Sequence, residues 1–315
     1  RALKSIQEQS RKPDFVVIVS NSTKENFSTE ENICNGFQFP LIQNNRTGNY
    51  AGALNTAVEE IIKHQDISEE LYFASLDDDD VWLSEYLTEI ENANTSNFDL
   101  IAANYLRSSE NENLLMQLPE QLSVKDFLQG NPGIGGSNTF VRLTTLLKAG
   151  CFDETLPSAV DRDFFVRVLQ TNPTYKLVPK HLVTAFTENN RERITTNIEK
   201  KKLGFQIFYY KYQHLMNETD KQMFFDRAKN FFSISREEIE SIPSNINKSV
   251  KHEIQFTGKG EYQFIIGFIA GDTNIAERIA KQISERNIPT DLVVIIDDTP
   301  KGTSLLPCED VLKAK

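Results

Sequence analysis

Hydrophobic and polar positions along the first 195 residues predict strands and helices in alternation. Short apolar runs between polar turns are typical of buried strands, and apolar residues three or four positions apart indicate helices that cover a sheet. Strands are expected at residues 15–19, 39–42, 71–76, 98–103 and 139–141, and helices at 1–12, 51–62, 143–149 and 161–167, with a further helix ending near residue 93. This alternation predicts an α/β fold in which helices cover both faces of a mostly parallel sheet.

The pattern changes near residue 196. Residues 196–245 combine lysines with aromatic residues at helical spacing, which predicts a helical extension whose aromatic stripe belongs to the core. Residues 246–261 are polar and are expected to form a linker. The chain is therefore expected to hold a first domain at residues 1–195, followed by this extension and linker.

Residues 262–315 carry a second copy of the N-terminal pattern. Residues 1–23 align without gaps with residues 278–300, and eight of the 23 aligned residues are identical. We interpret this as an internal repeat of a strand–helix–strand unit. The second copy has a strand before its helix, at residues 264–270, whereas the first copy begins at its helix. We therefore expect a piece of a longer protein, in which the first domain lacks its first strand and a second, similar domain begins at residue 262. Alternatively, residues 264–270 fold back and fill the vacant strand position.

Composition narrows the range of partners. The net charge of −11 and the pI near 5.0 argue against nucleic-acid binding and against an anionic membrane surface. No apolar run approaches the roughly 18 residues of a membrane span. The three cysteines are widely spaced and lack metal-ligand spacing, which favours a reducing compartment. We expect a cytoplasmic protein, with any peripheral contact to the inner membrane made through segments outside this chain.

Four consecutive carboxylates, Asp77 to Asp80, follow one of the expected strands. Such neighbours repel one another unless water, a helix N-terminus or a cation compensates them. In an extended chain Asp77 and Asp79 would point to one side and Asp78 and Asp80 to the other. A pair of carboxylates at a strand end suits a hard divalent cation that also binds a phosphate. The alternative is a solvated acidic turn in which Asp80 or Ser84 caps the next helix.

Two further stretches carry candidate site residues. Residues 131–138, with Gly135, Gly136 and Ser137, form a Gly-rich segment that allows close backbone approach, so either a ligand-lining loop or an ordinary turn is expected. Asp161 would begin a helix and face a cleft. Asp163 and Arg167 lie four positions apart on that helix and can pair on its surface.

Together these segments resemble the inverting family 2 glycosyltransferases of GT-A fold, over roughly residues 1–195. The resemblance rests on four segments in order: the helix and strand of residues 1–23, the turn and helix Arg46–Asn55, the DxD motif Leu76-Asp77-Asp78-Asp79-Asp80, and Gly150-Cys-Phe-Asp-Glu154 followed by Val160-Asp161-Arg162-Asp163-Phe-Phe-Val-Arg167.

The resemblance implies a role for each matching residue. Asp77 and Asp78 would lie near the ribose and diphosphate of a nucleotide-sugar donor, and Asp79 would ligate Mn²⁺ or Mg²⁺. Asp161 would be the general base that takes the proton from an acceptor hydroxyl, so that attack from the opposite face inverts the anomeric centre. The remaining implied contacts are to the nucleotide (Asn21 and Arg46), the diphosphate (Arg191 and Arg193), and the acceptor or its loop (Gly135, Gly136, Ser137 and Asp163).

The chain departs from the family pattern at three points. Asn21 stands where an aspartate is expected, Val160 replaces the glutamate before the base, and the closing loop near residues 187–195 lacks its histidine. The expected partners are a nucleotide-diphosphate sugar and a saccharide or glycolipid acceptor, as in bacterial surface polysaccharide or glycoconjugate synthesis. Two alternatives stay open: a GT-A-like nucleotidyltransferase, and a catalytically silent GT-A-like module that serves binding or assembly.

Overall fold

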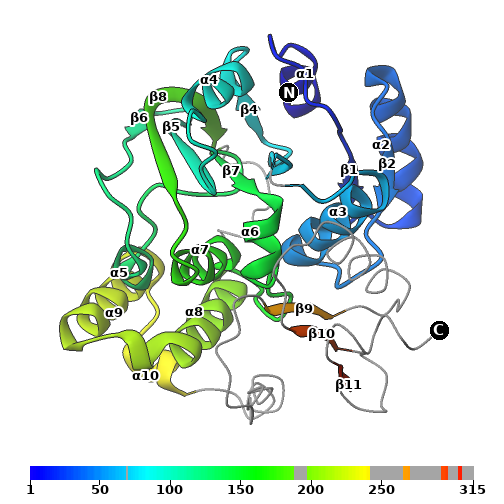
Figure 1. The fold of residues 1–315 in the computed structure, drawn as a ribbon. Helices are drawn as coiled ribbons and strands as arrows, with labels where there is room; N and C mark the ends of the chain where they lie inside the picture. Colours follow the sequence, from blue (N-terminus) through cyan, green and yellow to red (C-terminus); the bar gives the residue numbers. More distant parts are fainter. Residues whose placement is uncertain (69, 188–196, 242–264, 270–291, 297–303, 307–315) are drawn as a thin grey trace.

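The fold was obtained as a computed structural model (Figure 1). The structure describes residues 1–68, 70–187 and 197–241, together with the backbone of three strands at residues 265–269, 292–296 and 304–306. Arg191 and Arg193, the expected linker, and the helix expected in the second copy of the repeat lie outside the described residues.

A mixed six-stranded sheet forms the centre of the molecule. Its strands run in the order β3-β7-β5-β8-β4, and β6 pairs with β5 at the side of this path. Their bounds are β3 Tyr72–Ala74, β4 Asp80–Trp82, β5 Leu100–Ser108, β6 Asn113–Met116, β7 Thr139–Arg142 and β8 Tyr175–Phe186. Only the β5–β8 pair in this sheet is parallel, so the expectation of mostly parallel pairing was wrong here although the α/β class is confirmed. One physical reason is short connections: β6 follows β5 after residues 109–112, and such a hairpin can only pair antiparallel strands.

Two smaller sheets accompany the central one. Strands β1 (Ile18–Ser20) and β2 (Leu41–Gln43) pair in parallel with each other. Strand β9 (Ile265–Ile269) is parallel to β10 (Leu292–Ile296), and β11 (Ser304–Leu306) is antiparallel to β10. The strand expected at residues 264–270 is therefore β9, and it pairs with β10. It does not pair with β1, as it would if it filled the vacant strand position of the first domain.

Helices cover both faces of the central sheet, as the sequence predicts. Successive residues of β5 supply opposite cores, because side chains alternate along a strand: Leu100 and Ala102 belong to one hydrophobic cluster, Ile101 and Ala103 to the other. The first cluster includes α3 (Tyr50–His64), α6 (Leu143–Lys148) and α7 (Val160–Gln170). The second includes residues of α1 (Ala2–Gln7) and α4 (Tyr86–Ala93). This double coverage leaves the loops at the strand ends to form a site.

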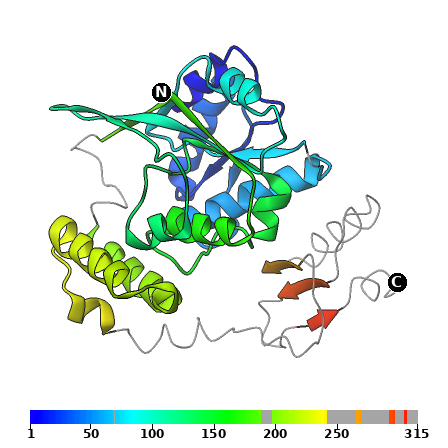
Figure 2. The ribbon, with the colours of Figure 1, turned by 60° about the vertical axis from the view of Figure 1, so that its left-hand side comes forward.

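The helical extension packs against the domain through aromatic side chains. It consists of α8 (Ile198–Tyr212), the short 3-10 turn η1 (Gln213–Leu215), α9 (Glu218–Phe232) and α10 (Arg236–Glu240), and these helices gather beside α5 (Val124–Gln129) and α7 (Figure 2). The rings of Phe205 and Phe224 lie 5.2 Å apart, and the predicted stripe of Phe205, Phe208, Tyr209 and Tyr212 is buried. Helix α2 (Lys24–Phe37), helix α5 and strands β4, β6, β8 and β11 were not expected from the sequence. No helix in the described part of the chain is long and apolar enough to cross a membrane.

Candidate active site

The four aspartates do not form an extended segment but a tight turn between β3 and β4. The amide of Asp80 donates a hydrogen bond to the carbonyl of Asp77 at 3.0 Å, and Asp78 and Asp79 lie between them. This i to i+3 bond is typical of a β-turn. Because of this turn, the aspartate side chains do not alternate between two sides as they would in an extended chain. Carboxylate oxygens of Asp77, Asp79 and Asp80 consequently lie within 4.8 Å of one another, whereas Asp78 is exposed and outside this group.

The acidic cluster of Asp77, Asp79 and Asp80 fits a hard divalent cation. Burial, together with the nearby carboxylates of Asp161, Asp80 and Asp79, raises the pKa of Asp77 to about 8. Because each of these negative charges destabilises the others, a cation with oxygen ligands would relieve the repulsion. Asp80, which the DxD resemblance did not assign, belongs to this cluster.

The Gly-rich loop lies between the acidic cluster and α7. Ser137 Oγ accepts a hydrogen bond from the amide of Asp77 at 3.1 Å, and the Ser137 carbonyl accepts one from Trp82 Nε1 at 2.7 Å. A Cβ atom at Gly135 would lie 3.8 Å from Asp161 Oδ2, and one at Gly136 would lie 3.9 Å from Asp77 Oδ1. The structure thus brings together five residues singled out in the sequence: Asp77, Gly135, Gly136, Ser137 and Asp161.

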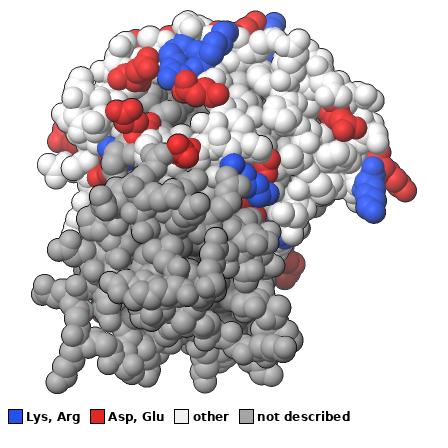
Figure 3. Space-filling view, turned by 45° about the vertical axis from the view of Figure 1, so that its right-hand side comes forward, with Lys and Arg blue, Asp and Glu red and all other residues white. Residues whose placement is uncertain are grey.

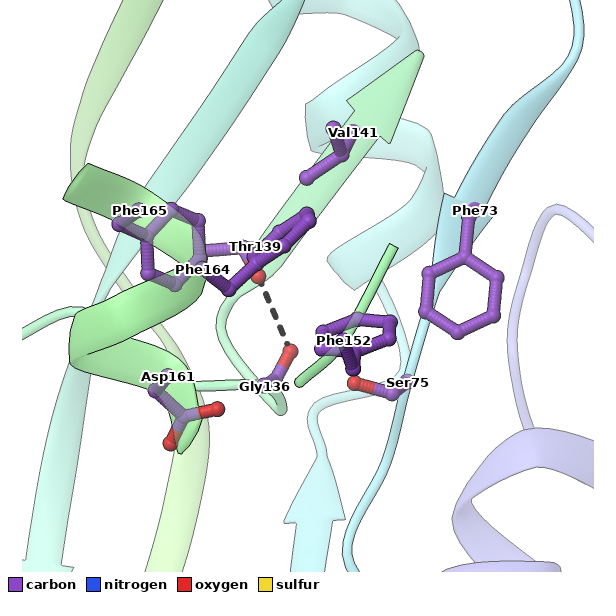
Figure 4. A pocket seen from close by; sticks show the side chains of 9 residues that line it. All are labelled: Phe73, Ser75, Gly136, Thr139, Val141, Phe152, Asp161, Phe164 and Phe165. Atoms are coloured by element: carbon purple, nitrogen blue, oxygen red, sulfur yellow. Dashed lines mark hydrogen bonds between the residues drawn. The ribbon is translucent and has the colours of Figure 1, made fainter. Parts of the chain in front are cut away.

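Asp161 lies in the first turn of α7, where the helix dipole favours a negative charge. Burial nevertheless raises the pKa of Asp161 to about 6, with Lys201 lowering it and Asp80 raising it. A small cavity of about 10 Å³, enough for about one water molecule, lies behind this carboxylate. Figure 4 shows aromatic rings along one side of the cavity, with Asp161, Gly136 and Ser75 at its edge. A carboxylate with a pKa near neutrality beside an apolar wall is suited to accept a proton.

Tyr50, which sequence reasoning did not single out, also belongs to the site. Its hydroxyl is buried and has no hydrogen-bond partner among the described residues. A Cβ atom at Gly136 would lie 2.5 Å from this hydroxyl, so the phenol faces the Gly-rich loop. Burial raises the pKa of Tyr50 well above its usual value, and Asp77 and Asp161 add to the increase. In the sequence, the one feature that could have pointed to Tyr50 is its position at the start of α3, next to the Gly-containing turn.

Two residues expected to hold the nucleotide are engaged with other parts of the chain. Arg46 is bonded to Glu154 at 2.5 Å and to Glu59, and its side chain is 16% exposed. Asn21 accepts a hydrogen bond from Asn44 at 2.6 Å and donates one to the carbonyl of Asn49 at 3.2 Å. Arg46 therefore neutralises two carboxylates beneath the β2–α3 turn, which leaves little of its charge for a ligand.

Asp163 does not face the acidic cluster. Its side chain is fully buried, bonded to Arg167 at 2.7 Å, to Tyr212 Oη at 2.8 Å and to Lys211. The expected Asp163–Arg167 pair exists, but it is buried rather than on the surface. Lys211 also bonds Asp153 at 2.6 Å, so this network joins α7, α8 and the segment after α6. The bonds of Asp163 therefore connect α7 to α8 at a buried position.

Three cations that the sequence did not single out, Lys201, Arg162 and Arg227, lie near one another, and Lys201 is close to Asp161. Lys201 on α8 lowers the pKa of Asp161, and its own pKa is lowered to about 8 by burial and by Arg162 and Arg227. Arg162 is buried, donates to the carbonyl of Phe127 at 2.8 and 3.0 Å, and lies over the ring of Phe208 at 4.3 Å. Lys201 and Arg227 come from the helical extension, which therefore contributes to the site.

Charged side chains elsewhere are mixed in sign. On the face shown in Figure 3, the described Lys and Arg side chains lie apart from one another among Asp and Glu, and they do not form a continuous basic surface there. This distribution agrees with the net charge of −11 and offers no basic patch for nucleic acid on that face.

No protein-family model and no curated protein sequence matches the chain. Its fold, however, matches solved structures of glycosyltransferases. S. aureus TarS matches with a TM-score of 0.50 and 14% identity, over 91% of this chain and 46% of that chain. GalNAc-T7, solved with UDP, GalNAc and Mn²⁺, matches with a TM-score of 0.50 and 12% identity, over 78% of this chain and 50% of that chain. The chain has the GT-A fold of these enzymes and spans about half of their length.

Proposed function

We propose that this chain is a metal-dependent glycosyltransferase that moves a sugar from a nucleotide-diphosphate donor to an acceptor hydroxyl with inversion at the anomeric carbon. One observation carries the proposal: the Gly-rich loop holds the acidic cluster of Asp77, Asp79 and Asp80 beside Asp161. A cation site next to a carboxylate with a raised pKa combines donor binding and proton abstraction in one place.

The donor side is assigned to the acidic cluster. Asp79 and Asp80, with Asp77, would hold Mn²⁺ or Mg²⁺, and Asp78 at the exposed corner of the turn would contact the ribose or diphosphate. When bound, the metal neutralises the charge that develops on the departing nucleoside diphosphate. GalNAc-T7, which shares the fold, was solved with UDP and Mn²⁺ together, and this supports the choice of ligands. Arg191 and Arg193 remain candidates for the diphosphate on the strength of the resemblance.

The acceptor side is assigned to Asp161. Its carboxylate would accept the proton of the attacking hydroxyl, and the aromatic side chains behind it form an apolar wall on one side of the carboxylate. Tyr50 and Ser75, which meet Gly136, fix the loop between the two carboxylate groups. Asp163 holds α7, and thereby Asp161, through its bonds to Arg167, Lys211 and Tyr212.

The finer assignment follows the sequence resemblance. We propose a hexosyl transfer of the family 2 type that acts on a saccharide or glycolipid acceptor in bacterial surface polysaccharide or glycoconjugate synthesis. We also propose a cytoplasmic location, with peripheral membrane contact through segments outside this chain. The DxD motif at Asp77–Asp79 and the Asp161-Arg-Asp163 segment support the family; the organism and pathway rest on the two-copy sequence pattern alone.

The test is release of nucleoside diphosphate from a panel of UDP- and GDP-sugars in the presence of Mn²⁺. Turnover should depend on Asp161 and persist in Asp226→Asn, because Asp226 is an exposed residue of α9 that bonds only Gln222. Proton NMR of the product should give the anomeric configuration opposite to that of the donor. Retention of configuration, or full turnover in Asp161→Asn, would contradict the assignment; nucleotide binding without any turnover would favour the silent module.

A further inference from the structure

The helical extension places two cations next to the proposed base. Lys201 lies in the first turn of α8 and close enough to Asp161 to lower the pKa of that carboxyl. Arg227 on α9 lies against Gly130, with its Nη1 3.4 Å from where a Cβ atom there would be. Gly130 directly precedes the Gly-rich segment that reaches Asp161. Figure 1 shows α8 and α9 beside α5 and α7, and Lys201 of α8 lies close enough to Arg227 of α9 for the charge of Arg227 to lower the pKa of Lys201.

These two cations differ from the other half-buried cations nearby in that, within the described residues, neither is hydrogen-bonded or ion-paired to a carboxylate. Within the described residues, the contacts of Lys201 and Arg227 are with aromatic rings: Lys201 Nζ is 5.1 Å from the ring centre of Phe232, and the Arg227 guanidinium is 5.2 Å from that of Phe231. Neither forms a hydrogen bond or ion pair with a carboxylate there. By contrast Arg46, Arg167 and Lys211 are each bonded to one or two carboxylates.

Burying cations side by side is unfavourable unless each has a counter-charge, and here the carboxylate of Asp161 acts on Lys201 alone among the three cations. Both side chains are only partly exposed, and Arg162 adds a third positive charge to the group. Arg162 is already committed to two backbone carbonyls on α5. Within the described residues, Lys201 and Arg227 therefore have donors that no carboxylate of the chain accepts, and these donors are available for an anion.

We propose that Lys201 and Arg227 form an anion subsite for the acceptor, so that the accepted substrate carries a phosphate or carboxylate close to the hydroxyl that receives the sugar. The assignment to the acceptor rests on the proposed function. Asp161 would contact the acceptor hydroxyl, whereas the donor diphosphate would lie at the acidic cluster, so a negative group held beside Asp161 belongs to the acceptor. The same cations would draw an anionic acceptor toward a protein of strongly negative charge.

The test measures binding of three small probes that offer hydroxyl groups: glycerol 3-phosphate, glucuronate and glycerol. Binding to the whole chain is followed by saturation-transfer NMR and calorimetry, for the unchanged protein and for Lys201→Gln, Arg227→Gln and the double variant. Lys202→Gln is the matched control, because Lys202 adjoins Lys201 on the same helix but its amine bonds Glu238 at 2.9 Å. Lys201→Arg keeps the charge and should retain binding. Thermal unfolding verifies that each variant is folded.

We expect the anions to bind at least about tenfold more tightly than glycerol, and each neutral substitution to weaken them about tenfold, since a hydrogen bond to a charged group is typically worth that much. Preference for glycerol 3-phosphate would indicate a phosphate acceptor, and preference for glucuronate a carboxylate acceptor. Mn²⁺-dependent UDP or GDP binding should stay within about twofold in the variants. Equal binding of glycerol and the anions would overturn the subsite, as would unchanged anion affinity in the folded double variant.

Two other results separate this inference from the function on which it rests. Loss of nucleotide binding in Lys201→Gln and Arg227→Gln, with anion binding unchanged, would move the cations to the donor site and overturn the acceptor assignment. If the protein binds the anions through Lys201 but binds no nucleotide, the anion site exists and the glycosyltransferase proposal is refuted.

Discussion

Trp82 Nε1 donates a hydrogen bond of 2.7 Å to the carbonyl oxygen of Ser137, which joins the strand after the acidic turn to the Gly-rich loop. The same serine accepts a hydrogen bond from the amide of Asp77, before that turn. One buried residue of the loop is therefore bonded to both sides of the acidic cluster. The geometry of the proposed metal site depends on this loop as much as on the aspartates.

Ser137→Ala tests this connection. It removes the acceptor of the Asp77 amide, and a buried hydrogen bond of this kind contributes about 1 kcal/mol to the free energy of unfolding. We expect a loss of about that size in urea unfolding and weaker Mn²⁺ binding. Ser84→Ala is the control, because the Ser84 hydroxyl bonds only the side chain of Glu85 at an exposed position. Unchanged Mn²⁺ affinity in Ser137→Ala would show that the loop does not hold the acidic cluster.

The two glycines of the loop should tolerate alanine differently. At Gly136 a Cβ atom would lie 2.5 Å from Tyr50 Oη and 2.8 Å from Ser75 Oγ, so these side chains must move. Overpacking of this kind costs about 1–3 kcal/mol, and we expect urea unfolding of Gly136→Ala to show it. Gly135→Ala is the matched control, since its Cβ atom would meet its nearest neighbours at an ordinary 3.8 and 3.9 Å. Equal destabilisation by both substitutions would contradict this packing.

Asp163→Asn should destabilise the fold strongly. The substitution leaves Arg167 and Lys211 without their shared buried carboxylate, and breaking one side of a buried ion pair typically costs about 3–5 kcal/mol. Asp226→Asn, on the exposed face of α9, should change the free energy of unfolding by less than about 0.5 kcal/mol. A folded Asp163→Asn protein of normal stability but altered acceptor KM would instead restore the acceptor role implied by the sequence.

The pH dependence of activity should follow Asp161. A base must be deprotonated to act, so kcat/KM should rise with pH through about 6 and then level off. Lys201 lowers the pKa of Asp161, so Lys201→Gln should move this rise to higher pH. Lys202→Gln should leave it in place. A rise that stays at the same pH in Lys201→Gln would show that Lys201 does not act on the base.

Metal-free protein should lose stability as pH rises from about 4 to about 8. The pKa of Asp77 is raised from 3.8 to about 8, so the folded state binds this proton more tightly than the unfolded chain and the free energy of unfolding falls as the proton leaves. Mn²⁺ should oppose this loss at pH 8, by about 2.7 kcal/mol at a hundred times its Kd. Asp79→Asn should abolish most of that gain. Equal stabilisation of Asp79→Asn by Mn²⁺ would place the metal elsewhere.

The sequence predicted the class of fold and most elements around the site, because those elements depend on local periodicity. It placed Asp77, Gly136 and Asp161 on segments that the structure brings together. It paired Asp77 with Asp79 correctly but put Asp80 on the opposite side with Asp78, because alternation holds only in an extended chain and the turn brings Asp80 to Asp77 and Asp79. Local sequence offered no way to see that Arg46 is bonded to Glu154, which lies 108 residues away.

The helical extension also contains contacts that local sequence does not reveal. Its aromatic spacing predicted a packed helix, and the rings of Phe205 and Phe208 are indeed buried. The same helix carries Lys201 to Asp161, which depends on how α8 packs against α7 and therefore left no signal in the pattern of α8 itself. Residues that join the site through tertiary packing, such as Lys201 and Tyr50, were the ones that sequence reasoning missed.

Calorimetric titration of UDP and GDP, with and without Mn²⁺, is the decisive measurement for the donor site. We expect that one of the nucleotides binds only with Mn²⁺, that Asp79→Asn abolishes this binding, and that Asp161→Asn preserves it because Asp161 serves the acceptor. If a folded protein binds neither nucleotide with Mn²⁺, or if Asp79→Asn binds as tightly as the unchanged protein, the acidic cluster is not the donor site and the proposed function is wrong.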